Sequence, residues 1–340
     1  MSLKAMIKVG AESLGFVAVG FTNIDPVPGL NRYKNWVETG QHAGMHYLAD
    51  ERALAARADP RRLLPSCKTV ISLLSTYAPP SQTLAIRPQE GRIAAYALQP
   101  DYHEVLKERL DRLSDLIRGF SEKTVGTYTC VDSAPILEKG YAQKAGLGWI
   151  GRNSLLINSI YGSWVFLSEL LINLDIEPNP PFERDGCEGC QLCIKACPTQ
   201  AIGPDRTVDA NRCLSYLTIE NRGEIPERFR AALGKRVFGC DQCQTVCPAN
   251  KNVNILEGQT PFIGEFVDLE EKFGLTAEEF KQKFQHTPVL RAKHAGFRRN
   301  IAIVMGNSGR KQFIPLLEKA LEQESDLIVA ESIRWALRQL

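Results

Sequence analysis

Eight of the ten cysteines lie between positions 187 and 247, and their spacing indicates iron–sulfur chemistry. The first four form the run C-x2-C-x2-C-x3-C and are followed by a proline: Cys187, Cys190, Cys193, Cys197 and Pro198. In bacterial ferredoxins this run binds [4Fe–4S] clusters, and its fourth cysteine ligates the other cluster of a pair. Structural zinc sites favour separated C-x2-C pairs, so the run favours iron–sulfur clusters over the zinc alternative.

A second run is incomplete and needs one cysteine from elsewhere. Its last three positions are Cys240, Cys243 and Cys247, again before a proline, but Val237 stands at the first position. Cys213 is the spare cysteine nearby, and it completes eight ligands for two four-cysteine clusters. We predict one ligand set of Cys187, Cys190, Cys193 and Cys247 and another of Cys197, Cys213, Cys240 and Cys243. Such a pair of clusters is an electron relay, which requires an acceptor.

The chain as a whole has the composition of a globular protein. It has 340 residues, 44% of them hydrophobic and 24% charged, with a net charge of +2, and this length leaves room for two or three domains. No apolar run is long enough to span a membrane, and the N-terminus lacks the layout of a secretory signal. We therefore expect a cytoplasmic protein without membrane association, in a compartment where disulfides are rare.

The hydrophobic pattern predicts a multidomain protein of the α+β or α/β class. Residues 1–175 are expected to form an α/β domain with helices at 2–14 and 103–120 and strands at 15–21, 69–74, 125–131 and 163–171. Residues 176–255, which begin with a proline-rich linker, are expected to form a bacterial-ferredoxin-like 2[4Fe–4S] domain. Residues 256–340 are expected to form a short helical segment of HEAT-like repeats that docks on the cluster domain, because so few repeats cannot bury a core alone.

Positive charge is concentrated near the C-terminus. Residues 281–317 contain eight Lys and Arg side chains and no acidic one, although the whole chain is nearly neutral. Such a run is usually a solvated face, but its density is also typical of a surface that binds phosphates, and the residues alone leave both readings open. The candidate nucleic-acid contacts are Arg222, Arg291, Lys293, Arg298, Arg299, Arg310 and Lys311.

Several stretches together resemble one family, the epoxyqueuosine reductases. They are RADPRRLLP at 57–65, DYH at 101–103, VDSAPILE at 131–138, KAGLGW at 144–149, RCLSYLTIE at 212–220 and GCDQCQTVCP at 239–248. Each stretch is modest alone, but together they follow the family's order over nearly the whole chain. The corrinoid reductive dehalogenases are more distant relatives that share the two-cluster module.

The resemblance implies an oxidoreductase that reduces epoxyqueuosine to queuosine at the wobble position of tRNA, the last step of queuosine biosynthesis. It implies cob(II)alamin beside two [4Fe–4S] clusters, a tRNA with a GUN anticodon as substrate, and a low-potential electron donor such as ferredoxin or flavodoxin. We also expect a monomer. No D-x-H-x-x-G signature is present in the sequence, so the cobalamin prediction rests on the resemblance alone.

The resemblance also implies which residues contact the cobalamin. They are Arg57, Asp132, Asn153, Leu156, Leu167, Ser215 and Asp241. By pattern alone, Arg57 would be a surface arginine in an Arg-rich stretch. Some relatives carry a cysteine close to the cobalt, and Ala94 stands at the matching position, so no cobalt-bound thiolate is expected here. Cys67 and Cys130 are expected to be small buried core residues.

Asp132 has two interpretations. D-S-x-P is a common helix start, so the pattern makes Asp132 or Ser133 the N-cap of a helix over 134–145. The resemblance instead makes Asp132 the proton donor to the epoxide oxygen, with a pKa raised by burial beside the corrin. Tyr102 and His103 open the helix at 103–120 and serve either as local caps or as pocket residues.

Two other functions remain open from the sequence. A corrinoid reductase of small molecules, such as a reductive dehalogenase, would need no basic segment. The other alternative is an electron carrier with two clusters and no substrate of its own, but this function would not explain the N-terminal domain or the C-terminal helices. A cob(II)alamin spectrum would exclude the carrier, and tRNA binding would exclude the dehalogenase.

Overall fold

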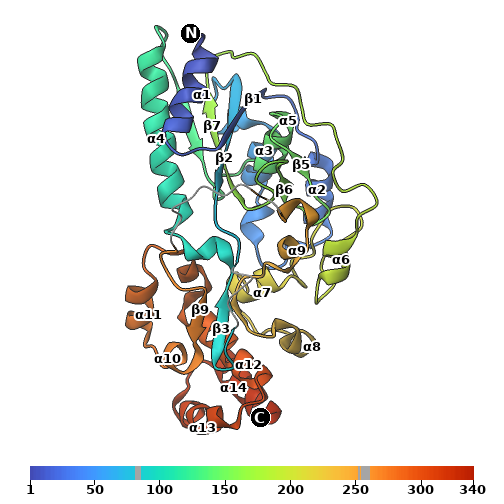
Figure 1. The fold of residues 1–340 in the computed structure, drawn as a ribbon, viewed down its shortest axis with the longest axis vertical. Helices are drawn as coiled ribbons and strands as arrows, with labels where there is room; N and C mark the ends of the chain where they lie inside the picture. Colours follow the sequence, from blue (N-terminus) through green and yellow to red (C-terminus); the bar gives the residue numbers. More distant parts are fainter. Residues whose placement is uncertain (81–85, 252, 254–260) are drawn as a thin grey trace.

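The computed structural model describes residues 1–80, 86–251, 253 and 261–340. The N-terminus and a four-stranded sheet lie at one end of the elongated molecule, and the C-terminal helices lie at the other end (Figure 1). No helix within the described ranges is long and apolar enough to cross a membrane.

The N-terminal sheet has the strand order β1-β2-β7-β4, and every pair in it is antiparallel. Its strands are β1 (Ala18–Asn23), β2 (Thr69–Thr76), β7 (Val165–Ile172) and β4 (Thr127–Cys130). Every residue of β2 is buried, because helices cover both faces of the sheet. The strands overlap the four predicted stretches, so the mixed α and β content is confirmed, and the antiparallel order makes this part α+β.

Helices pack on both faces of this sheet. One face carries α1 (Leu3–Ser13) and α4 (Tyr102–Phe120), both predicted from the sequence. The other face carries α5 (Glu138–Lys144), with α2 (Leu30–Glu38) and α3 (Glu51–Ala58) on the same side (Figure 1). The side chain of Asp101 caps α4 by accepting the N–H of His103 at 3.0 Å. This cap fixes the point at which the helix begins, next to the candidate site.

The helix expected over 134–145 begins only at Glu138. Leu137 is the N-cap of this helix, α5, and it makes no side-chain capping hydrogen bond. Residues 131–137 form an irregular loop between β4 and α5. The interpretation of Asp132 or Ser133 as a helix N-cap is therefore wrong, because both residues lie in the loop ahead of the helix.

A second sheet, with the order β8-β3-β9, joins distant parts of the chain. β3 (Glu90–Ile93) is parallel to β8 (Arg236–Phe238) and antiparallel to β9 (Phe266–Asp268). Each of the three predicted domains contributes one of these strands, so the three parts share structure. The predicted boundary at 255 lies outside the described residues, and the division into domains remains a prediction. A short hairpin of β5 (Trp149–Ile150) and β6 (Leu156–Ile157) lies beside the first cysteine run.

Apart from β8 and β9, the regular structure described in the cysteine region and the C-terminal region is helical. The first contains α6 (Leu192–Ala196), α7 (Leu214–Ile219), α8 (Glu227–Arg230) and α9 (Gln242–Thr245). The second contains α10 (Leu269–Phe273), α11 (Ala277–Phe284), α12 (Lys293–Asn307), α13 (Ile314–Gln323) and α14 (Leu327–Gln339). α12 is buried along most of its length and packs against α14, β8 and α7 in one core. The C-terminal helices thus dock on the cysteine region as expected, while their HEAT-like character remains a prediction.

Candidate functional site

A cavity of about 750 Å³ lies between the α5 side of the N-terminal sheet and the second predicted cysteine set. Its wall includes six of the predicted cofactor contacts: Arg57, Asp132, Asn153, Leu167, Ser215 and Asp241. The exception is Leu156, whose side chain is buried in the core with Leu74 and Leu147. A side-chain contact from Leu156 to a ligand is therefore not supported, because the residue points into packed protein.

Two side chains in the cavity wall have unpaired hydrogen-bond donors. Arg57 lies in the last turn of α3, with its guanidinium carbon 5.3 Å from the centre of the Tyr33 ring. Its Nη1 atom and the Nδ2 atom of Asn153 are buried and have no hydrogen-bond partner among the residues that the structure describes. An unpaired buried donor costs about 1–3 kcal/mol, so this wall is suited to a ligand with hydrogen-bond acceptors.

A chain of hydrogen bonds surrounds Asp132. The Tyr102 hydroxyl donates to Asp132 Oδ2 at 2.9 Å, and His103 Nε2 lies 3.1 Å from the same oxygen. His103 Nδ1 lies 2.7 Å from Oδ1 of Asp101, the residue that caps α4. The start of α4 therefore brings Tyr102 and His103 to Asp132, while Asp101 provides the local cap.

These contacts determine the protonation states of Asp132 and His103. Burial raises the pKa of Asp132, but the hydrogen bond and charge of His103 and the Tyr102 hydroxyl outweigh burial and lower it below its usual value. Burial lowers the pKa of His103, but its hydrogen bonds to Asp101 and Asp132 outweigh burial and raise it to about 9. The predicted rise in the pKa of Asp132 is wrong for this arrangement: at neutral pH the aspartate is ionised and the proton lies on His103.

The cysteines of the first predicted set lie close together in space. Burial raises the pKa of Cys193, and the other three members of its set raise it further. The indole N–H of Trp149 donates to Cys187 Sγ at 3.4 Å, the kind of contact that tunes the reduction potential of a cluster. No cysteine of this set lines the cavity, so the first set is the more remote of the two.

The second predicted set forms part of the cavity wall. All four of its members line the cavity: Cys197, Cys213, Cys240 and Cys243. Burial, together with the nearby Cys240 and Cys197, raises the pKa of Cys213 to about 11. Within the described ranges no three His, Cys, Asp or Glu side chains are close enough to hold a single metal ion, and ligation of a cluster by these cysteines remains a prediction.

The second cysteine run is tied to the N-terminal part of the chain. The side chain of Asp241 accepts the backbone N–H of Ala95 at 2.9 Å. The Gln244 side chain donates to the carbonyl oxygen of Ser163 at 2.9 Å. These bonds fix the second cysteine set opposite the wall that holds Asp132.

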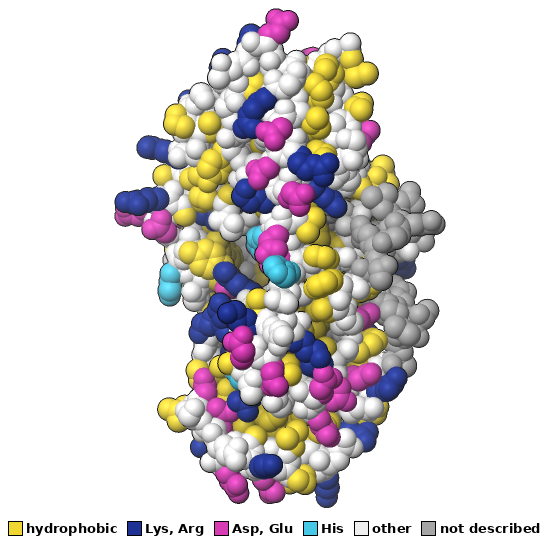
Figure 2. Space-filling view, turned by 90° about the vertical axis from the view of Figure 1, so that its left-hand side faces the viewer, with side chains coloured by type: hydrophobic (Ala, Val, Ile, Leu, Met, Phe, Trp, Pro, Cys, Tyr) yellow, Lys and Arg dark blue, Asp and Glu magenta, His cyan; other side chains and the backbone are white. Residues whose placement is uncertain are grey.

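The basic segment is divided when it folds. Arg291 lies in the short helix at 288–292 and Lys293 is the first residue of α12, whereas Arg310 and Lys311 follow the end of α12. The 15 residues of α12 span about 22 Å, so the two pairs are well separated. On the face drawn in Figure 2, Lys and Arg side chains gather at mid-height and mix with acidic ones below. Arg291 lies close to the cavity, because it pairs with Glu220 of the cavity wall at 2.5 Å.

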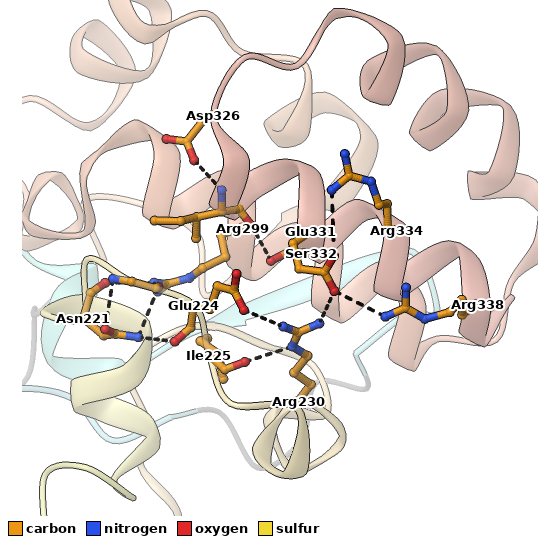
Figure 3. Close-up of polar contacts among 12 residues, drawn as sticks. Asn221, Glu224, Ile225, Arg230, Arg299, Asp326, Glu331, Ser332, Arg334 and Arg338 are labelled. Carbon is orange, nitrogen blue, oxygen red and sulfur yellow. Dashed lines mark hydrogen bonds and ion pairs between the residues drawn. The ribbon is translucent and has the colours of Figure 1, made fainter.

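Arg299 is an interior residue and not a surface contact for nucleic acid. It is 1% exposed, and its guanidinium donates to the carbonyl oxygens of Asn221 and Gly223 at 2.8 and 2.6 Å (Figure 3). Its other Nη atom donates to the carbonyl of Leu217 at 2.7 Å. The prediction that Arg299 binds tRNA is thus wrong, because this side chain is used to hold α12 on the segment after α7.

Arg298 and Arg222 are also partly engaged in the protein. Arg298 pairs with Glu324, and its side chain is 19% exposed. Arg222 donates to the carbonyl oxygens of Arg291 and Ala292, so it supports the short helix at 288–292. Both residues remain candidate contacts for tRNA, although each already forms a contact that stabilises the fold.

Removal of the Arg299 guanidinium is expected to destabilise the protein strongly. In Arg299→Met, the carbonyl oxygens that it serves lose their donor, and each buried unpaired group costs about 1–3 kcal/mol. We expect a clearly lower unfolding midpoint in urea for the anaerobic protein. Arg334→Met is the matched control, because Arg334 is half exposed and pairs only across the surface with Glu331. Equal midpoints for the two variants would contradict this account of Arg299.

Comparison with known proteins first defines the class. Residues 186–250 match the family described as "4Fe-4S double cluster binding domain", so the predicted double-cluster domain is confirmed. Residues 57–133 match the family described as "Epoxyqueuosine reductase QueG, DUF1730". The chain therefore combines an iron–sulfur redox module with an N-terminal part of a specific enzyme type.

Full-length comparisons define the family. The epoxyqueuosine reductase of Aliivibrio fischeri is 38% identical over 342 residues, which cover 98% of this chain and 90% of the relative. The solved epoxyqueuosine reductase of Streptococcus thermophilus superposes with a TM-score of 0.91 at 30% identity and covers 100% of this chain and 90% of that one. A crystal structure of epoxyqueuosine reductase with a tRNA-Tyr epoxyqueuosine-modified stem loop has a TM-score of 0.85 at 27% identity, with coverage of 99% and 98%. The chain belongs to the epoxyqueuosine reductase family.

Some residues of the site are not identified by the sequence argument. Tyr33, Trp36, Tyr96, Glu138 and Lys139 all line the cavity. Glu138 lies within the VDSAPILE stretch, but nothing in the sequence alone indicates that its half-buried side chain hydrogen-bonds to the backbone of Asp132. The aromatic residues carry no spacing signal, since they come from loops and short helices far apart in the chain.

Proposed function

We propose that this chain reduces epoxyqueuosine to queuosine at the wobble position of tRNA. Membership of the family supports this function. The observation that carries it is the cavity, whose wall includes Asp132, Tyr102 and the second cysteine set. Tyr102 hydrogen-bonds to Asp132, and His103 Nε2 lies 3.1 Å from the same carboxylate. A reduction that releases water needs protons and electrons at one place, and this cavity has a source of each.

The reaction consumes two electrons and two protons. Both carbon–oxygen bonds of the epoxide break, the oxygen leaves as water, and a carbon–carbon double bond remains. An acid must protonate the departing oxygen, because an alkoxide in a poorly hydrated pocket would be costly. We assign both proton transfers to Asp132, which takes each proton from His103 and passes it to the oxygen, while His103 regains a proton from solvent between the two transfers. The Tyr102 hydroxyl holds the carboxylate in place between these transfers.

We propose cob(II)alamin as the second cofactor. When bound and reduced, its cobalt supplies the electrons to the substrate carbon. The residues that would hold it are Arg57, Asn153, Leu167, Ser215 and Asp241, with Leu156 limited to a backbone contact. The unpaired donors of Arg57 and Asn153 fit the amide oxygens at the edge of a corrin, and a volume of about 750 Å³ suits a cofactor site. Ala94, the position of a cysteine in some relatives, is buried outside the cavity wall.

The order of the clusters follows from their distance to the cavity. The second set lines the cavity and delivers electrons to the site, while the first set is remote and receives them from outside. The external donor is a low-potential protein such as ferredoxin or flavodoxin. We further propose that the chain works as a monomer in the cytoplasm.

tRNA is proposed to bind where basic side chains lie near the cavity. Arg291, just before α12, and Lys293, its first residue, are both exposed. Arg291 also lies beside the exposed Tyr47 ring at 5.8 Å. The double variant Arg291→Glu with Lys293→Glu should weaken tRNA binding and reduce the slope of log affinity against log salt by about 2, one for each lost phosphate contact. Lys319→Glu, on the exposed surface of α13, is the matched control. Unchanged affinity and slope in the double variant would place the tRNA elsewhere.

The rival substrate class is a halogenated small molecule. Anaerobic protein loaded with iron, sulfide and cobalamin should convert tRNA that carries epoxyqueuosine and leave a halogenated phenol unchanged. Conversion of the phenol without conversion of the tRNA would favour a reductive dehalogenase and overturn the proposal.

A further inference from the structure

The loop that carries Asp132 adopts an unusual conformation. Asp132 has a φ of +50°, in the left-handed region that few residues other than glycine occupy. The neighbouring Ser133 N–H bonds back to the carbonyl oxygen of Val131, which closes a tight turn at this point. The side chain of Asp132 is 59% exposed, and it lines the cavity. A strained backbone of this kind persists only when surrounding contacts hold it.

The side chain of Glu138 forms a hydrogen bond with the backbone of this turn. Glu138 Oε1 accepts the backbone N–H of Asp132 at 2.6 Å, well within hydrogen-bond distance. Glu138 is the first residue of α5, so the bond closes the whole loop from 132 to 138 onto its own helix. The helix is itself fixed, because Tyr141 is 1% exposed and the Lys139 ammonium donates to the carbonyl of Ser154 at 2.8 Å.

We propose that Glu138 is a positioning residue, whose carboxyl oxygen clasps the Asp132 N–H and so keeps the Asp132 carboxylate directed at the substrate. This inference rests on the proposed function and adds a residue to it. Glu138 touches the backbone of Asp132 and not its carboxylate, so it acts through Asp132. Without the clasp, the loop would lose the bond that compensates its left-handed turn, and the carboxylate would leave its place beside Tyr102 and His103.

The groups around Glu138 favour the protonated, uncharged form of its carboxyl group. Burial and the nearby charge of Asp132 raise the pKa of Glu138 to about 8. Glu169, on β7, is also buried, and burial and Glu138 raise its pKa. The cations that act on Glu138 are Lys139, whose pKa is lowered by burial, and His103, and both lower the pKa of Glu138. An uncharged Glu138 still accepts through its carbonyl oxygen, and it avoids repulsion with the ionised Asp132.

Two substitutions separate a clasp from other roles. Glu138→Gln keeps a carbonyl oxygen at the same position, so turnover of epoxyqueuosine tRNA should stay within roughly threefold of wild type. Glu138→Leu keeps the size but removes the acceptor, and kcat should fall about 10²-fold while KM for tRNA and the iron and cobalamin content stay unchanged. Glu51, in the exposed first turn of α3, is the matched control, and Glu51→Leu should behave as wild type.

A second readout does not depend on activity. Hydrogen exchange followed by mass spectrometry should show the Asp132 amide exchanging at least about tenfold faster in Glu138→Leu than in wild type or Glu138→Gln. If wild type exchanges slowly but does not convert the tRNA, the proposed function fails while the clasp stands. An inactive Glu138→Gln would overturn the clasp in favour of an ionisable role. An active Glu138→Leu, or unchanged exchange in that variant, would also overturn it.

Discussion

Asp132→Asn is expected to lower turnover of epoxyqueuosine tRNA by about 10²-fold or more, the usual scale for loss of a general acid. The amide of asparagine can accept a hydrogen bond from Tyr102 or His103, but it cannot pass a proton to the departing oxygen. Asparagine also tolerates the left-handed backbone at this position, so the loop should keep its shape. Iron content, cobalamin content and tRNA affinity should therefore equal those of the wild type.

The pH dependence gives this prediction a second test. In the proposed mechanism the proton for the reaction comes from His103. Burial lowers the pKa of His103, but its hydrogen bonds to Asp101 and Asp132 outweigh burial and raise it to about 9. Turnover of the wild type should thus fall as the pH rises through about 9. In Asp132→Asn the remaining activity should fall at a lower pH, because one negative partner of His103 is gone. An Asn variant with normal turnover would move the acid to Tyr102, to His103 or to a water molecule.

Cys213→Ala is expected to remove one cluster and leave the other. Iron should fall from about eight to about four atoms per chain, by the stoichiometry of two four-iron clusters. Turnover should be lost, because Cys213 belongs to the set that lines the cavity and that we propose to deliver electrons there. The cluster of the first set should persist, since its four cysteines come from other positions.

Cys67→Ala is the control for this substitution. Cys67 is 3% exposed and belongs to a hydrophobic cluster under the sheet, so its loss should not change the iron content. Iron determination and electron paramagnetic resonance of the reduced proteins give the comparison. Eight iron atoms in Cys213→Ala would show that the ligand assignment is wrong.

The sequence predicts much of the site because its signals are local. Cysteine spacing is a property of short segments. The second run lacks one of the four ligands that a cluster needs, which indicates Cys213 as the fourth, and the fold brings Cys213 near Cys240 and Cys197. Strands and amphipathic helices are also local patterns, so α1, α4 and the four strands of the N-terminal sheet lie where they are expected. Cys67 and Cys130 are buried as predicted.

The errors concern properties that depend on tertiary contacts. The pKa of Asp132 is lowered by side chains at the start of α4, 29 and 30 residues away along the chain, and no local pattern reports that contact. The basic segment is read from charge density, but only the fold shows that Arg299 is buried and that α12 separates Arg291 from Arg310. For the same reason the sequence does not show that the Leu156 side chain is buried, which leaves only its backbone for the predicted contact.

The most direct test of the account is the nucleoside formed on tRNA. Anaerobic protein with both clusters and cobalamin should be incubated with a low-potential reductant and tRNA that carries epoxyqueuosine, and the digested nucleosides analysed by mass spectrometry. The account predicts that the modified nucleoside loses the mass of one oxygen atom and becomes queuosine, and that omission of cobalamin or reductant prevents this change. Unchanged epoxyqueuosine in the presence of the fully loaded, reduced protein would contradict it.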